Sequence, residues 1–224
     1  MAHRKPAESV TVTHPTPGRA YAGLDPEARQ AHRRAQFIEA GLRLFGSIGY
    51  RATTMRLLCA EAGLTNRYFY ESFESIEALL MACYEQLIGA HRQAFLEAIE
   101  QAPDDLPSKL EAGLKCFLTA MQNPTFARIT QLEVIGVSPQ VDALYTRAMR
   151  DFSEIATKLL ERYGLGRDRS KRELQLIAFA LTGGMVMTAG MWMRSGYRDP
   201  IETVMRATLT LLLGTVRELE EPQV

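Results

Sequence analysis

Apolar positions recur with the period of an α-helix over most of the chain. Between Pro26 and Gly49 they are spaced by four, three, one and three residues, on one helical face: Phe37, Gly41, Leu44, Phe45 and Ile48. A second apolar face follows Thr54 and is closed by Gly63, a residue suited to the left-handed turn after a helix. Thr65 is expected to cap a short third helix. Ser75 begins a fourth pattern, with one side formed by Leu80, Tyr84, Leu87, His91 and Phe95.

The remaining chain predicts five more helices, over about 107–122, 124–135, 139–163, 170–195 and 199–219. Four prolines lie near helix starts, where a missing N–H group costs little: Pro107, Pro124, Pro139 and Pro200. No segment shows the sustained alternation that a strand requires. The pattern therefore predicts an all-α protein with about nine helices.

Residues 1–25 follow neither period and contain several prolines and glycines. We expect a disordered arm there. We expect an N-terminal helical domain over 26–74 and a C-terminal helical domain over 75–224.

Residues 54–73 have the spacing of a helix-turn-helix, with a glycine turn at Gly63–Leu64. In this motif the first helix braces the second, whose N-terminal residues enter the major groove of DNA. The N-terminal domain is therefore predicted to bind DNA.

Four aromatic residues crowd into the second helix of this motif. Phe69 and Phe73 are four positions apart, so they share a face and are predicted to be core. A solvated surface is one interpretation of the other faces. It would leave two tyrosines exposed beside an arginine, which is an uncommon use of surface. DNA contact is the other interpretation, for Asn66, Arg67, Tyr68 and Tyr70.

The charge distribution agrees with a DNA-facing front. The whole chain has a formal net charge of zero, but residues 1–73 contain 10 basic and 6 acidic residues. The rest is net acidic, so only the front is expected to meet an anion.

Cysteine and histidine usage suggests neither a metal site nor a cofactor. The three cysteines have no CxxC spacing, and we expect all three to be small buried residues. The four histidines are scattered. No secretory segment or catalytic motif is visible, so we expect a cytoplasmic protein that is not an enzyme.

Residues 176–193 form an uncharged run of 18 residues, the lower edge of a membrane-spanning length. Three glycines and two threonines favour instead a helix buried on both sides, with no membrane contact. A helical small-molecule-binding or membrane-associated protein without a DNA-binding role stays as the alternative.

Residues 30–80 resemble the DNA-binding domain of the TetR family of bacterial transcription regulators. The resemblance is carried by an ordered set of motifs: Leu44–Phe45, Gly49–Tyr50, Thr53–Thr54, Ala62–Gly63–Leu64, Thr65 and Tyr70–Phe73. The C-terminal region resembles the family in helix number and length.

The resemblance implies a homodimeric repressor of double-stranded operator DNA that a small-molecule effector releases. It implies phosphate contacts for Tyr50 and Thr54, and a cap with a phosphate or base contact for Thr65. Tyr70 would pack on the sugar-phosphate backbone. Asn66, Arg67 and Tyr68 take the base-reading positions, and their chemistry suits adenine, guanine and thymine in turn.

Two positions depart from the family pattern. Many members have glycine at the position of Arg67 and lysine at that of Ile76, which Glu74 and Glu77 flank here. Unless Arg33, Arg34, Arg51 or the arm compensates, we expect weak binding with a shallow salt dependence.

The last two helices are the predicted dimer interface, because apolar residues recur along both. The predicted residues are Met185, Trp192, Ile201, Val204, Met205, Thr208 and Leu212. Large apolar residues on central helices are candidates for a largely apolar effector site, with an ordinary core as the alternative: Phe117, Met121, Phe126, Tyr145, Phe152, Phe179 and Met187.

Overall fold

The computed structural model describes residues 25–220, and all regular secondary structure in that range is helical. Nine α-helices and one π-helical segment follow in order: α1 Pro26–Ser47, α2 Met55–Ala62, α3 Asn66–Tyr70, α4 Ile76–Gln101, α5 Leu106–Met121, α6 Pro124–Arg128, η1 Ile129–Glu133, α7 Pro139–Arg162, α8 Lys171–Arg194 and α9 Ile201–Glu220. The all-α prediction is confirmed. The arm predicted for residues 1–25 lies, apart from Asp25, outside the described residues.

Polar side chains define most of the helix starts. Six helices begin after a residue whose side chain accepts a backbone N–H bond: Thr54, Ser75, Asp105, Asn123, Ser138 and Ser170. Asp25 precedes Pro26 as predicted, but its side chain makes no such bond. These local signals explain why the predicted helix limits agree closely with the observed ones.

The helix predicted over 124–135 is divided in the structure. After five residues α6 changes into η1, whose wider turns interrupt the α-helical bonding. Thr130 and Gln131 of η1 are buried, and the Thr130 hydroxyl donates to the carbonyl of Phe126 at 2.8 Å. The periodicity of the sequence gives no sign of this change.

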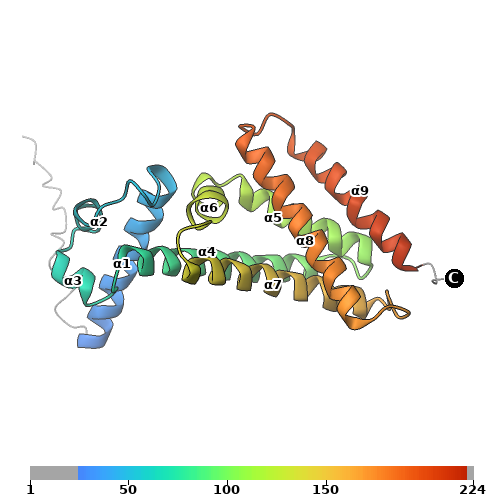
Figure 1. The fold of residues 1–224 in the computed structure, drawn as a ribbon, viewed down its shortest axis with the longest axis horizontal. Helices are drawn as coiled ribbons and strands as arrows, with labels where there is room; N and C mark the ends of the chain where they lie inside the picture. The colour runs from blue at the N-terminus through green and yellow to red at the C-terminus, as the bar shows by residue number, and fades with distance from the viewer. Residues whose placement is uncertain (1–24, 221–224) are drawn as a thin grey trace, which may run out of the picture.

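Helix α4 joins the two halves of the molecule. Its 26 residues extend for about 39 Å, from the compact group of α1, α2 and α3 to the far end of the C-terminal region, with α7 alongside (Figure 1). One apolar core contains Phe37, Leu58 and Phe69 together with Leu80 of α4 and Val141 of α7. The predicted domain boundary at 74–75 therefore lies between elements that share a core.

Helices α8 and α9 pack against each other on one side of the C-terminal region (Figure 1). Among residues 25–220, α8 is the one helix long and apolar enough to cross a membrane, and 22% of its most apolar window is buried. Length and composition of this kind also occur in helices that pack against protein.

Candidate functional site

The turn between α2 and α3 is formed as the sequence predicts. The Thr54 hydroxyl accepts the N–H of Leu57 at 3.3 Å, which fixes the first turn of α2. Gly63 ends α2 with a φ of 65°, a left-handed conformation that costs a non-glycine residue about 1–2 kcal/mol. The next helix, α3, begins three residues after this glycine, at Asn66.

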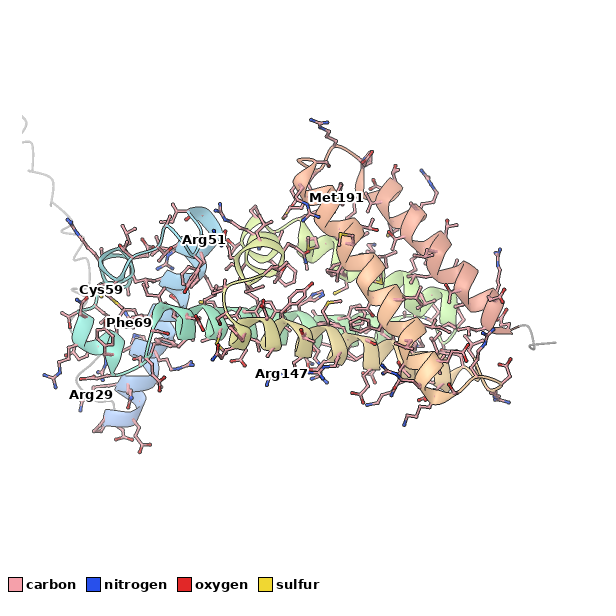
Figure 2. All side chains as sticks on the ribbon, viewed as in Figure 1. Arg29, Arg51, Cys59, Phe69, Arg147 and Met191 are labelled. Atoms are coloured by element: carbon pink, nitrogen blue, oxygen red, sulfur yellow. The ribbon has the colours of Figure 1, made fainter. Side chains whose placement is uncertain are left out.

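Aromatic packing fastens α3 to the domain. Phe69 is fully buried, and its ring centre lies 5.1 Å from that of Phe37 and 5.7 Å from that of Phe73. Figure 2 shows Phe69 pointing from α3 toward α1. Phe73 is also buried. The prediction that these two residues are core is confirmed.

The polar residues of α3 lie on its outer faces. The Arg67 side chain is 84% exposed and Tyr70 is 63% exposed, while Asn66 and Thr65 are exposed beside them. Thr65 occupies the capping position without a side-chain hydrogen bond to the helix, so its hydroxyl is not used as the cap that we predicted. The Asn66 side-chain oxygen accepts the Cys59 thiol at 3.0 Å, which orients that amide.

Tyr50 is less accessible than the other predicted contact residues. It is half-buried after α1, and its ring packs on Phe45 at 5.9 Å between centres. Burial and the charge of Glu77 raise the pKa of its hydroxyl. Its backbone N–H donates to Glu133 at 2.7 Å. The structure therefore places Tyr50 at the junction with η1 rather than on the open surface of α3.

A carboxylate that the sequence analysis did not identify organises this surface. Glu71 accepts from Arg67 at 3.0 Å and from Arg33 of α1 at 3.3 Å. The guanidinium of Arg33 also lies over the Tyr68 ring, 4.5 Å from its centre. The spacing of four between Arg67 and Glu71 was the available signal, because such pairs are neighbours on a helix.

The arginines expected to replace the missing lysine differ in availability. Arg33 is held by Glu71, and Arg34 lies over the Phe73 ring at 4.8 Å. Arg51 is exposed at the turn after α1 (Figure 2) and has no ion pair among residues 25–220. Ile76, at the position in question, is half-buried in the first turn of α4.

A cavity of about 120 Å³ lies between α4, α5, α7, α8, α9 and the segment formed by α6 and η1. Four predicted effector-site residues line it: Phe117, Phe126, Tyr145 and Phe152. Met121 is fully buried but is not part of the lining, and Phe179 and Met187 are 42% and 63% exposed. These three are removed from the candidate site, because helical spacing does not tell a cavity wall from solid core or from surface.

The lining also includes residues that the prediction left out, notably Tyr84, His91 and Phe95 of α4. The sequence pattern had placed these three on one side of a helix. His91 is surrounded by four phenyl rings, with ring centres at 5.2–6.1 Å. Burial lowers its pKa from 6.5 to about 4, so the ring is neutral at pH 7.

Comparison with known proteins relates the helix-turn-helix domain to a protein family. Residues 37–83 match the family described as bacterial regulatory proteins, tetR family. The N-terminal domain belongs to the tetR family. The HTH-type transcriptional regulator YerO of Bacillus subtilis (strain 168), whose name marks it as uncharacterized, is 37% identical over 57 residues. That alignment covers 25% of this chain and 20% of YerO.

Solved structures extend the similarity to the whole fold. The fatty acid degradation regulator FadR from Bacillus halodurans superposes with a TM-score of 0.70 at 17% identity, over 83% of this chain and 96% of FadR. FadR from Bacillus subtilis in complex with stearoyl-CoA gives 0.67 at 16% identity, over 80% and 96%. At such identities the likeness concerns the fold, which is a tetR-like fold over both halves of the chain.

Several of the predicted dimer residues are buried within the chain itself. Trp192, Val204, Thr208 and Leu212 are at most 7% exposed and face the interior of the chain itself. They are therefore removed from the predicted interface. Met185 lines the cavity, and Ile201 and Met205 are half-buried against the same core.

Other apolar residues of α8 and α9 face outward instead: Leu176, Phe179, Met187, Met191 and Leu211. We call these five residues the α8–α9 apolar face. A side chain added at Gly183 of α8 or Gly214 of α9 would meet no atom of the chain within 4 Å.

The segment of α6 and η1 connects the cavity to the DNA-binding domain. Phe126, Thr130 and Gln131 of this segment line the cavity. In the same segment Arg128 donates to the Ser47 carbonyl at 2.6 Å and to Glu133 at 2.7 Å. Since Glu133 also accepts from Tyr50, the turn after α1 is bonded directly to a wall of the cavity.

The cysteines differ from their predicted environment. Cys83 is buried, but Cys59 and Cys116 are half-buried, and all three are free thiols. Burial raises the pKa of each, most strongly for Cys83. The polar contact of Cys59 with Asn66 explains why that thiol stays near the surface.

Proposed function

We propose that the protein is a DNA-binding transcription regulator, a homodimeric repressor that a small-molecule effector releases from its operator. The observation that carries this proposal is the outer face of α3, exposed on a helix-turn-helix whose domain belongs to the tetR family. The family and the fold are those of transcription regulators rather than enzymes.

In the proposed complex α3 enters the major groove. Asn66, Arg67 and Tyr68 point toward base edges, while Thr54, Thr65 and Tyr70 meet the phosphates. Arg67 must leave Glu71 to reach a base, and an exposed ion pair of this kind opens at little cost. Tyr50 contributes at the edge of the surface, through a hydroxyl on a half-buried ring.

The α8–α9 apolar face is the proposed dimer interface. It replaces the buried residues first predicted, because an interface needs side chains that the subunit leaves exposed. Gly183 and Gly214 leave room for the backbone of a partner helix to approach closely. Pairing two subunits also places two recognition helices on half-sites about one helical turn apart.

Effector release is proposed to act through the segment of α6 and η1. A ligand in the cavity contacts Phe126 and Thr130, and the bonds of Arg128 and Glu133 carry their displacement to the turn after α1. The structural similarity to FadR in complex with stearoyl-CoA supports a ligand-binding role for this half of the fold.

Binding to DNA from the region upstream of the protein's own coding sequence tests the proposal. Fluorescence anisotropy at low salt should show saturable binding that is tighter than binding to a random duplex of equal length. A variant with Tyr70 and Arg67 both changed to alanine should lose the preference while keeping its circular dichroism. Absence of binding to every fragment at low salt would overturn the proposal.

A further inference from the structure

His91 occupies an unusual position among the cavity-lining residues. It is 8% exposed, it lies midway along the row of α4 positions that line the cavity, and four phenyl rings surround it. No hydrogen bond to its ring is found among residues 25–220. Polar groups in protein interiors are nearly always hydrogen-bonded, so ring nitrogens without a protein partner in a cavity wall are available to a molecule inside the cavity.

The remaining polar groups of the cavity are largely satisfied by the protein. Thr130 and Thr182 donate to carbonyls of their own helical segments at 2.8 and 2.9 Å. Lys109, the one charged residue of the lining, donates to the carbonyls of Ile99 and Ala102 and lies 3.6 Å from Asp104. The remaining polar groups of the lining are the hydroxyls of Tyr84 on α4 and Tyr145 on α7 and the side-chain amide of Gln131 on η1.

The charge of the lining restricts the ligand. No aspartate or glutamate lines the cavity, so a cationic ligand would lose its hydration without gaining a counter-charge. An anionic ligand would depend on Lys109, whose charge already has carbonyl and carboxylate partners. A neutral imidazole, in contrast, offers one donor and one acceptor to an uncharged group.

The cavity volume sets the size of ligand that the structure accepts without rearrangement. Its 120 Å³ is close to the volume of about 150 Å³ at which an apolar protein cavity binds benzene. One six-membered ring therefore fits between the phenyl rings around His91, and a short apolar extension is accommodated by movement of the flexible Met149 and Met185 side chains of the lining.

From these observations we infer that the cavity binds an uncharged, mostly apolar molecule whose single hydroxyl or carbonyl group hydrogen-bonds to His91. This inference rests on the proposed effector-binding role of the cavity and specifies its ligand class. It makes His91 the residue that distinguishes a hydroxylated ligand from a pure hydrocarbon of the same shape.

Four probes with one shared apolar body test the inference: 4-propylphenol, propylbenzene, 4-propylbenzoate and 4-propylbenzylamine. Calorimetry at pH 7 on the wild-type protein without DNA should show 4-propylphenol binding tightest, about 3- to 10-fold tighter than propylbenzene, as expected for one buried hydrogen bond. The two ionised probes should bind more weakly than propylbenzene. Tighter binding of either ionised probe, or no binding of any probe, overturns the inference.

Two variants locate the hydrogen bond. His91→Phe should bind 4-propylphenol and propylbenzene equally, whereas Tyr145→Phe should keep the preference for the phenol. A preference that survives in His91→Phe would contradict the assignment. In the wild-type protein the nitrogen resonances of the His91 ring should shift with 4-propylphenol and stay in place with propylbenzene, a test that needs no variant to fold.

The result is separable from the proposed function, because every probe is measured without DNA. Failure of the protein to bind DNA would leave the preference for the phenol intact. Loss of the probe preference alone would leave the DNA-binding proposal unaffected and remove only the ligand class.

Discussion

At the scale of single residues, Glu71 gives two arginines of the predicted DNA-binding surface a negatively charged partner in the absence of DNA. Its carboxylate holds Arg67 and Arg33, and Arg33 in turn covers the Tyr68 ring. Two cations needed near a polyanion are thus paired with a carboxylate in the free protein. Glu71 therefore competes with DNA. Arg67 and Arg33 must break their ion pairs with Glu71 before they can contact phosphates or base edges.

The first prediction separates base reading from backbone contact on α3. Arg67→Ala should relax the preference at one operator position by about 1–3 kcal/mol, the value of a bidentate contact to guanine. Tyr70→Phe should weaken specific and random duplexes alike, because a backbone contact carries no sequence information. Anisotropy titrations on both kinds of duplex measure this. Equal losses in both variants would contradict the assignment.

The second prediction concerns His91 and acid. Its pKa falls from 6.5 in the unfolded chain to about 4 in the folded protein, so between these values the unfolded state binds more protons. The resulting stability is fully present above pH 6.5 and is lost as the pH falls to 4, by about 3 kcal/mol. Urea unfolding of wild type and His91→Phe at pH 4, 5 and 7 measures it. The two proteins should differ in the slope against pH, and parallel curves would contradict the prediction.

At the scale of helices and turns, much of the fold follows from the sequence. Capping residues such as Thr54, Ser75 and Ser138 act through local hydrogen bonds, so they mark helix starts without knowledge of tertiary packing. Phe69 and Phe73 could be assigned to the core because helical spacing alone places them on one face.

The features that escaped prediction depend on partners distant in sequence. The ion pair of Arg33 and Glu71 joins residues 38 positions apart, and the Tyr50–Glu133 bond spans 83 positions. Trp192 was placed at an interface because residues 176–193 of α8 are apolar on all sides, and Val204 because it belongs to an apolar stripe on α9. Periodicity then cannot tell the side that meets its own chain from the side left exposed.

The third prediction compares two glycines in turns. Gly63 has a φ of 65° and open space around it, so Gly63→Ala should cost about 1–2 kcal/mol of unfolding free energy. Gly49 has a φ of 90°, and a side chain there would lie 2.7 Å from Arg128 and 2.8 Å from Glu133. Gly49→Ala should therefore cost more than Gly63→Ala in urea unfolding. Equal losses of unfolding free energy in the two variants would show that the Arg128 and Glu133 side chains move aside at little energetic cost.

The fourth prediction tests the α8–α9 apolar face. Met187→Glu should give a monomer of 25.1 kDa in light scattering, where the wild type gives twice that mass. A carboxylate buried in an apolar interface would lose its hydration without gaining a counter-charge, which is strongly unfavourable. Leu57→Glu, an equivalent change at an exposed leucine of α2, should leave the dimer intact. A monomeric wild type would remove the interface from the proposal.

At the scale of the whole molecule, charge and shape are divided between the two ends. The first 73 positions have an excess of basic residues, 10 against 6 acidic ones, whereas the α8–α9 apolar face lies in the C-terminal half. A dimer joined through that face carries two DNA-binding domains, so any change on α4 or α3 acts twice on the same operator.

The fifth prediction uses the presence of two DNA-binding domains in one dimer. Ile76→Lys should tighten DNA binding and steepen the slope of log affinity against log salt by about 2, one phosphate contact from each subunit. Gln93→Lys adds the same charge on an exposed site of α4 far from α3 and should leave the slope nearly unchanged. Equal effects of the two variants would indicate a general charge effect in place of a local phosphate contact.

The π-helical segment η1 has a consequence for how a small ligand could act on a large surface. A π turn contains about one residue more than an α turn, and each residue of an α-helix corresponds to a rotation of about 100°. Conversion of η1 to regular α-helix would therefore rotate Glu133 about the helix axis relative to Tyr50 and Arg128. Such a rotation would break the hydrogen bond from the Tyr50 backbone to Glu133, which connects the turn after α1 to the segment that lines the cavity.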